Sequence, residues 1–212
     1  MKELTKGIDS SVVIIITWVL MIVVVSSCKN ELSPSAYVSW VRDSANGLKL
    51  ERKIDPYTIS VQYKPQDYMA LQEIRGTGMT AVEYDTIEKS YEGAEYYDLG
   101  ISVTGSNKDF MMYNIKSPNE YFTKEQYMTF QLQKHLTLVA GRDTLPCKIF
   151  HFERNYNSSP ISHFSIGFDE PKEKSANRLI IYDDEILGLN QVILEIQGKN
   201  IAKVPRLKYS QN

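Results

Sequence analysis

The chain has 212 residues and a formal net charge of −2, with 24 basic and 26 acidic side chains. This near-neutral balance argues against a nucleic-acid partner, because nucleic-acid binding normally requires a strongly basic face. Fourteen tyrosines make the chain rich in aromatic residues, which is typical of half-buried strand positions and also of surfaces that bind sugars or peptides. The length suits one domain with a substantial core.

The first feature along the chain is an apolar run from Val12 to Val25, interrupted only by Thr17. It follows a short charged lead, and it is about 14 residues long, which is less than the roughly 20 residues that a membrane-spanning helix needs. Its length and position match the apolar region of a secretory signal. An uncleaved anchor and a buried core helix are the alternatives.

The run ends in Val25-Ser26-Ser27-Cys28, which resembles the lipobox of bacterial lipoprotein precursors. That motif has Leu, Val or Ile three residues before a cysteine and a small residue directly before it, and Val25, Ser27 and Cys28 match these positions. Two acids in the charged lead depart from the pattern. The resemblance implies lipidation of Cys28, with fatty acids such as palmitate, and cleavage between Ser27 and Cys28. A signal cleaved without lipidation and a retained anchor are the alternatives.

This resemblance divides the chain into a signal peptide at 1–27, a lipidated cysteine with a short tether at 28–33, and one α+β domain at 34–212. It implies a place in the cell envelope, with the membrane itself as a partner through the acylated cysteine, and the outer membrane is favoured over the inner one. Only one acid, Glu31, follows closely behind Cys28, and the lack of an acidic run there favours the periplasmic side over the cell surface.

Helix signals dominate the first half of the expected domain. Ser33-Pro34 is typical of a helix start, and further helices are expected at about 66–74 and 80–91. A strand pair is expected at 48–54 and 57–64, because the second segment alternates apolar and polar residues with a period of two.

Strand signals dominate the second half. Strands are expected at 96–104, 110–115, 136–140, 145–154, 161–168, 178–182 and 191–197, with a last short segment near Ile201. A four-residue turn from Gly141 to Thr144 joins two of them, and a helix is expected from Thr123 to about Lys134. The sum is an α+β fold: a mainly antiparallel sheet of about eight or nine strands, with three or four helices mostly in the N-terminal half.

The cysteines offer little catalytic chemistry. With Cys28 lipidated, Cys147 has no disulfide partner in the chain, and a lone cysteine is usually a small buried hydrophobe. Cys147 and His151 share one face of the expected strand at 145–154, but they lie roughly 13 Å apart along it. That distance is too long for a hydrogen bond between a nucleophile and its base.

The three histidines, His135, His151 and His163, form no spaced metal motif. His151 and His163 would face each other if the strands at 145–154 and 161–168 paired, and this would supply two of the three or four ligands that zinc requires. Half-buried histidines of a sheet are the simpler interpretation. The sequence therefore assigns no catalytic, cofactor-binding or metal-binding residue, and no cofactor.

Three other patterns have ordinary structural explanations. The acidic run Asp183-Asp184-Glu185 does not match a calcium loop and is expected to be a solvated turn. Gly76-Thr77-Gly78 lacks the lysine of a phosphate-binding loop and is expected to link two helices. Acids and tyrosines between Glu83 and Asp98 are expected to form a solvated helix face, or a partner surface if there is one.

We therefore expect a membrane-anchored lipoprotein that acts by binding, as a non-catalytic component of an envelope complex. The alternative is an enzyme or a small-ligand carrier with a pocket between sheet and helices. A pocket that joins polar side chains to Cys147, His151 or His163 would favour the alternative. A filled core with an exposed aromatic patch would favour the binding component.

Overall fold

The computed structural model describes residues 31–74, 80–155 and 158–209. The apolar run, the lipobox-like residues and the Gly76-Thr77-Gly78 linker lie outside these ranges. The chain divides into two units, Met1–Glu31 and Leu32–Asn212, and apart from Glu31 the features below belong to the second unit.

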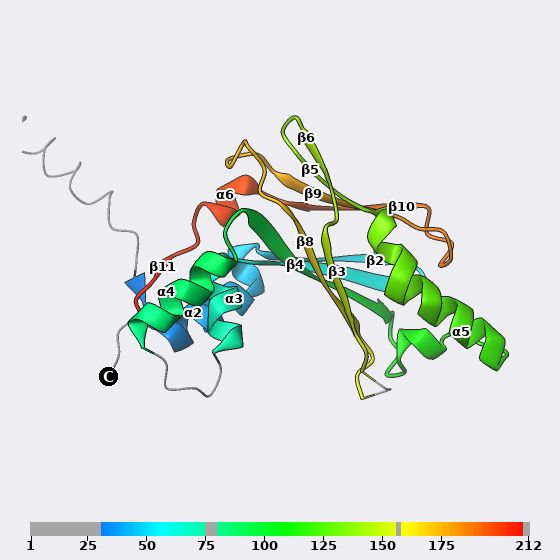
Figure 1. The fold of residues 1–212 in the computed structure, drawn as a ribbon. Coiled ribbons are helices and arrows are strands. Elements are labelled where there is room, and N and C mark those ends of the chain that lie inside the picture. Colours follow the sequence, from blue (N-terminus) through cyan, green and yellow to red (C-terminus); the bar gives the residue numbers. More distant parts are fainter. Residues whose placement is uncertain (1–30, 75–79, 156–157, 210–212) are drawn as a thin grey trace, which may run out of the picture. The chain divides into compact units, whose positions relative to one another are not determined.

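Helices and strands alternate irregularly along the chain (Figure 1). The helical segments are α2 (Pro34–Arg42), η1 (Ser44–Asn46), α3 (Gln66–Glu73), α4 (Ala81–Ser90), η2 (Phe110–Met112), α5 (Pro118–Gln126), η3 (Tyr127–Gln131), η4 (Leu132–His135) and α6 (Gly198–Ile201). The strands are β1 (Glu31–Leu32), β2 (Lys49–Ile54), β3 (Tyr57–Lys64), β4 (Ala94–Val103), β5 (Leu136–Ala140), β6 (Asp143–Pro146), β7 (Ile149–Glu153), β8 (Ser162–Asp169), β9 (Arg178–Asp183), β10 (Gln191–Ile196) and β11 (Arg206–Leu207).

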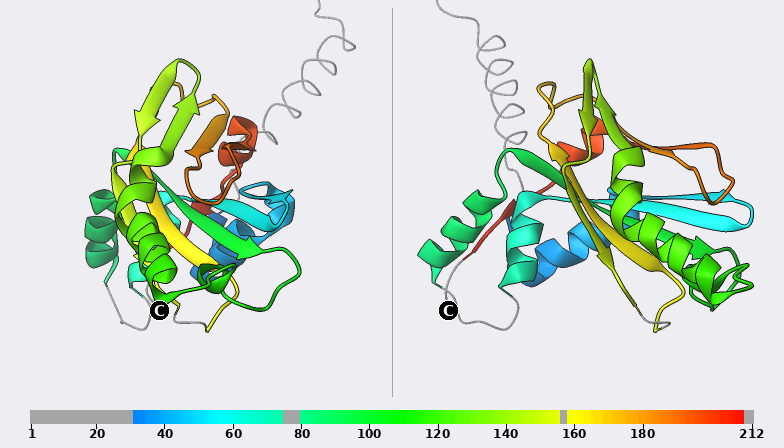
Figure 2. Two further views of the ribbon diagram at one scale, coloured as in Figure 1. Left: turned by 90° about the vertical axis from the view of Figure 1, so that its right-hand side faces the viewer. Right: turned by 45° about the vertical axis from the view of Figure 1, so that its right-hand side comes forward.

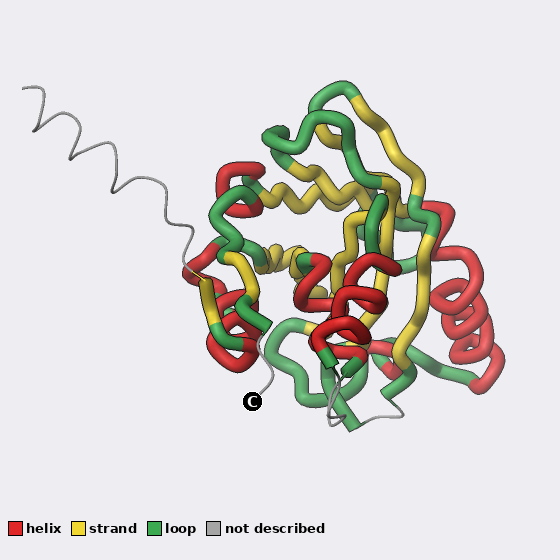
Figure 3. The backbone as a smooth tube through the Cα atoms, turned by 60° about the vertical axis from the view of Figure 1, so that its left-hand side comes forward, coloured by secondary structure: helices red, strands yellow, loops and turns green. Residues whose placement is uncertain are grey.

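The strands form two main sheets. One has five strands in the order β2-β3-β4-β8-β7, and the other has four in the order β10-β9-β5-β6. Every strand pair within these two sheets is antiparallel. The short strands β1 and β11 form a ladder of their own. Figure 3 shows strands in yellow at the centre, with helices in red on both sides of them.

The main core lies between the two large sheets. Alternation within β3 directs Tyr57, Ile59 and Val61 inward, and the same period in β9 and β10 directs side chains such as Tyr182 and Leu194 into the same cluster. At one end of this core a buried ion pair joins the sheets, because Arg178 of β9 contacts Glu95 of β4.

A second apolar cluster belongs to the helices α2, α3 and α4. It contains Tyr37 and Val41 of α2, Tyr68 of α3 and Tyr84 of α4. Thr80 caps α4, since its hydroxyl accepts from the Glu83 amide while the Glu83 carboxylate accepts from the Thr80 amide. Figure 2 shows these helices away from α5, which lies beyond the other end of the strands.

The α+β fold class is confirmed, but the prediction of a single sheet with eight or nine strands is wrong. The expected strand at 145–154 breaks after Pro146, so that β6 joins the four-stranded sheet and β7 joins the five-stranded one. Cys147 sits at the break and packs in the core between the sheets. The prediction that the helices lie mostly in the N-terminal half is not confirmed, because α5, α6 and the short segments η2, η3 and η4 all lie in the second half.

Three local predictions are wrong, and each error lies at a turn or at a helix start. The expected strand at 110–115 is the helical turn η2, whose first residues are held by the Asp109 carboxylate. The helix expected from Thr123 begins at Pro118 instead, since the Ser117 hydroxyl accepts from the Glu120 amide. The expected four-residue turn after β5 has only two residues, because β6 already begins at Asp143.

Candidate functional site

The predicted lipidation site Cys28 and the cleavage position at Ser27 and Cys28 lie outside the described residues. The structure therefore leaves them as predictions. Within the described residues, no helix is both long and apolar enough to cross a membrane.

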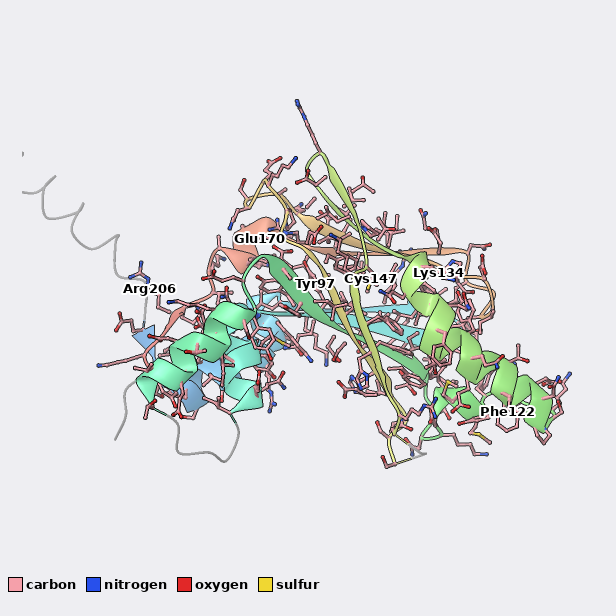
Figure 4. The ribbon with its side chains drawn as sticks, in the orientation of Figure 1. Tyr97, Phe122, Lys134, Cys147, Glu170 and Arg206 are labelled. Carbon is pink, nitrogen blue, oxygen red and sulfur yellow. The ribbon has the colours of Figure 1, made fainter. Side chains whose placement is uncertain are left out.

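Cys147 is a buried structural cysteine. Its side chain is 7% exposed, and its thiol donates a hydrogen bond of 3.1 Å to the Ile149 carbonyl. Burial raises the pKa of the Cys147 thiol to about 11, so the thiolate is scarce at neutral pH. Figure 4 shows Cys147 among the strands, away from the helix that carries the labelled Phe122.

The predicted pairing of β7 with β8 is confirmed, but it does not bring the two histidines opposite each other. His151 pairs with Ser165, and His163 pairs with Glu153. His135 lies elsewhere, stacked on Tyr127 at 5.5 Å between ring centroids. No group of three or more metal-ligating side chains occurs among the described residues.

His163 takes part in a charged cluster on the solvent side of the five-stranded sheet. Its Nδ1 atom lies 2.9 Å from the Asp98 carboxylate, and the Lys64 ammonium lies 3.8 Å from the same carboxylate. The hydrogen bond to Asp98 raises the pKa of His163, and partial burial opposes this effect. The pair could orient a general base, but no hydroxyl or thiol nucleophile hydrogen-bonds His163 among the described residues.

A concave feature with a volume of about 720 Å³ lies along β7. We call it the β7 groove. It is lined by residues of η3 and η4 on one side and of β7 and its end on the other: Thr129, Phe130, Gln133, Phe150, His151, Phe152 and Arg154. Its volume falls within the range of ordinary ligand sites.

The lining of the β7 groove shows that it follows the edge of the strand. Phe150, His151 and Phe152 are consecutive, and consecutive side chains of a strand point to opposite faces of the sheet. A groove that contacts all three therefore runs beside the backbone of β7. This strand is the last in its sheet, and no described strand pairs with its outer side.

The helical side of the β7 groove depends on a local irregularity. A π-helical turn at Tyr127–Gln131 follows α5, and such turns change which side chains face outward. Phe130 within it is 66% exposed, which is unusual for a phenylalanine. Gln133 is held in place because its side-chain amide donates to the Cys147 carbonyl at 3.1 Å.

A second pocket, about 380 Å³ in volume, contains a buried lysine. Lys124 of α5 is 6% exposed, and its ammonium donates to the Phe110 carbonyl at 2.5 Å and lies 4.5 Å above the Phe110 ring centroid. No carboxylate of the described residues forms an ion pair with it. Burial lowers the pKa of Lys124 to about 8, and Asp109 opposes that effect. Tyr57, Tyr113 and other residues complete the pocket.

The acidic run has a structural role. The Asp184 carboxylate accepts hydrogen bonds from the Leu187 and Leu189 amides at 2.9 Å and also from the Tyr182 hydroxyl. Asp184 therefore closes the loop between β9 and β10, which explains the position of this carboxylate without a bound cation.

Sequence reasoning singled out His151 and Cys147, and it missed the β7 groove and Lys124. The groove joins residues about 20 positions apart in the chain, and its helical side depends on the π-helical turn. The spacing of Thr129, Phe130 and Gln133 in the sequence does not indicate that these residues would meet β7.

Comparison with known proteins gives little further guidance. No family model matches the chain, and no curated protein matches it. Among solved structures, a DUF4426 family protein from Pseudomonas aeruginosa PAO1 is similar over 70% of this chain and 90% of its own, with 6% identity. The TM-score is 0.32, and this likeness carries no argument about function.

Proposed function

We propose that the protein is a membrane-anchored bacterial lipoprotein that acts by binding, as a non-catalytic component of an envelope complex. Acylation of Cys28, followed by removal of residues 1–27, would hold it on the periplasmic side, more readily on the outer membrane than on the inner one. The support for this anchor is Val25-Ser26-Ser27-Cys28 directly behind an apolar run of signal-peptide length. Mass spectrometry of the mature N-terminal peptide tests it, because an unmodified Cys28 would refute it.

The observation that carries the binding proposal is the β7 groove. Its floor is the outer edge of a strand that no described strand covers, and its walls hold Phe130, Phe150 and Phe152. Exposed backbone at a strand edge pairs readily with another extended chain, and aromatic side chains beside it supply apolar contact. The occupant that fits best is therefore an extended segment of a partner protein, added to the sheet next to β7.

Polar side chains at the groove add specificity. Arg154 donates to the Glu125 carboxylate at 3.1 Å, and Gln133 and His151 lie along the same groove. A partner segment that places a carboxylate beside Arg154 and apolar residues against the phenylalanines would satisfy both kinds of contact.

Photo-crosslinking in intact cells tests this function. A photoreactive phenylalanine analogue replaces Phe130, and the matched control carries it at Phe122, which is 58% exposed on α5 but does not line the groove. We expect position 130 alone to crosslink to one defined segment of another envelope protein, identified by peptide mass spectrometry. Phe150→Ala should reduce that crosslink by about tenfold, as expected for the loss of one well-packed aromatic contact. Equal crosslinking at both positions, or none at 130, would contradict the proposal.

The Lys124 pocket supports a second candidate function, that of a small-ligand carrier. A buried ammonium whose partners are a carbonyl and a ring leaves room for an anionic ligand to supply the counter-charge. Native mass spectrometry of protein purified from membranes would detect such a ligand. A ligand lost in Lys124→Met but retained in Phe130→Ala would favour the carrier over the groove-binding function.

A further inference from the structure

The last part of the chain is strongly basic. No acidic residue follows Glu195, whereas four basic residues do, in a chain whose formal net charge is −2. We call Lys199, Lys203, Arg206 and Lys208 the basic segment. Charge of one sign gathered in so short a stretch is an electrostatic feature of that surface.

The basic segment is built so that its charges face solvent. All four basic side chains are exposed. Ile201, Val204 and Leu207, which lie between them, and Tyr209, which follows Lys208, pack against the cluster of α2, α3 and α4. None of the four forms an ion pair with a described residue. Arg206, labelled in Figure 4, extends away from the ribbon. The four charges are therefore free to meet an external anion.

The ends of the basic segment are fixed to the domain. At its start, the Gly198 amide donates to Asn177 at 3.0 Å, and a side chain at Gly198 would come within 2.1 Å of the Ser175 carbonyl oxygen. At its end, the Lys208 amide donates to the Leu32 carbonyl at 2.8 Å. The charges thus keep a defined place relative to Leu32.

Leu32 lies four residues after Cys28 in the sequence. A fully extended chain spans at most about 3.6 Å per residue, so the Cα atom of Cys28 can lie no farther than about 14 Å from that of Leu32. A lipid on Cys28 would keep Leu32 within that reach of the membrane surface. Lys208, whose backbone amide donates to the Leu32 carbonyl, would be kept at a similar reach, so that its side chain can approach the headgroups to within the screening length of roughly 8 Å.

We propose that the basic segment docks on anionic lipid headgroups of the membrane that holds Cys28, and thereby orients the domain. The proposal rests on the lipid anchor proposed above. Each basic residue close to an anionic bilayer strengthens attraction by about fivefold, and the effect declines within a screening length. Anchor and basic segment together form the two-signal arrangement that makes peripheral attachment stable and directional.

Lipid-quenching fluorescence of the full acylated protein in nanodiscs tests the proposal. An environment-sensitive fluorophore is placed on Ala202→Cys within the basic segment, and in a separate sample on Thr144→Cys of β6; both positions are exposed, and Cys147 is buried. Nanodiscs contain phosphatidylcholine with or without phosphatidylglycerol, and a nitroxide headgroup lipid serves as quencher. We expect strong quenching at position 202 with phosphatidylglycerol, severalfold less at high salt, and little at position 144.

Charge substitutions separate docking from simple tethering. Replacing all four residues of the basic segment with glutamine should abolish the quenching at position 202 that depends on phosphatidylglycerol. A matched control replaces four exposed lysines elsewhere, Lys49, Lys53, Lys108 and Lys172, with glutamine, and should leave that quenching unchanged. Equal loss in both variants, or no loss in either, would overturn the proposal.

Mass spectrometry of the Cys28 peptide from the same samples distinguishes a failure of the docking proposal from a failure of the proposed lipid anchor. If Cys28 is acylated but the quenching at position 202 does not change with lipid charge or with the substitutions, the docking is refuted and the lipoprotein function still stands. Cys28 without acyl chains would refute the anchor and, with it, this orientation.

Discussion

The buried ion pair between Arg178 and Glu95 joins the two main sheets. The two Arg178 donors Nε and Nη2 contact both oxygens of Glu95 at 2.7 to 3.1 Å, and the Tyr97 hydroxyl donates to the same carboxylate at 2.7 Å. Arg178 is 1% exposed and Glu95 is 6% exposed. Arg178→Met would remove the charge partner and leave a buried carboxylate with one neutral donor.

The expected cost of Arg178→Met is about 4 kcal/mol, since breaking a buried pair from one side costs roughly 3 to 5 kcal/mol. That is a large part of the roughly 5 to 15 kcal/mol that stabilises a typical domain. For a domain of this size, the midpoint of thermal unfolding should fall by about 12 °C. Urea denaturation of the mature protein at neutral pH measures the change, with the slope of the transition as a check on two-state behaviour.

Two further variants decide whether the reasoning is right. Adding Glu95→Leu to Arg178→Met removes the stranded carboxylate and should recover about half of the loss, while the Tyr97 hydroxyl remains without its acceptor. Lys148→Met breaks the exposed pair with Asp169, whose side chains are 58% and 49% exposed, and should cost less than about 1 kcal/mol. A loss below about 1 kcal/mol for Arg178→Met, or a double variant no more stable than the single one, would refute the argument.

Three predictions concern titratable side chains. Asp98 raises the pKa of His163. The bond between them therefore stabilises the fold fully below about pH 6.5, and its contribution disappears as pH rises through the raised pKa of the folded state. NMR titration of Asp98→Asn should show a lower pKa for His163, and an unchanged pKa would contradict the prediction. Burial lowers the pKa of Lys124 from 10.5 to about 8, so the unfolded chain binds more protons between these values. The stability of the wild type relative to Lys124→Met should therefore rise with pH over that range in urea denaturation, and a flat difference would contradict the prediction. Burial raises the pKa of Cys147 to about 11, so iodoacetamide should modify its thiol at neutral pH only after urea is added, and rapid alkylation of the folded protein would argue against a buried thiol.

Elements with strong local signals were predictable from the sequence. The period-two alternation of Tyr57 to Lys64 gives the bounds of β3, and the start of α2 follows Ser33-Pro34 as predicted. The burial of Cys147 also follows from its residue type and its lack of a partner. In each case the prediction depends only on residues that are close together in the sequence.

Features that depend on distant contacts were not predictable. Alternation shows which side chains of a strand are buried, but it does not say which strand will pair with it, so the division into two sheets at Pro146 and Cys147 was missed. The β7 groove was missed for the same reason, since it requires Phe130 and Phe150 to meet from separate elements. The helix expected from Thr123 begins earlier, at Pro118, because the Ser117 hydroxyl caps it there.

The short ladder at Leu32 and Lys208 also affects how the domain would respond to a pulling force. Tension applied through an N-terminal anchor enters the domain at Leu32, where β1 and β11 each contribute only two residues. So short a ladder yields to a pull before the longer strands of the main sheets do. In the lipid-anchored molecule proposed above, a pull would therefore separate β1 from β11 first. The ladder would be the first contact to break between that anchor and the rest of the domain.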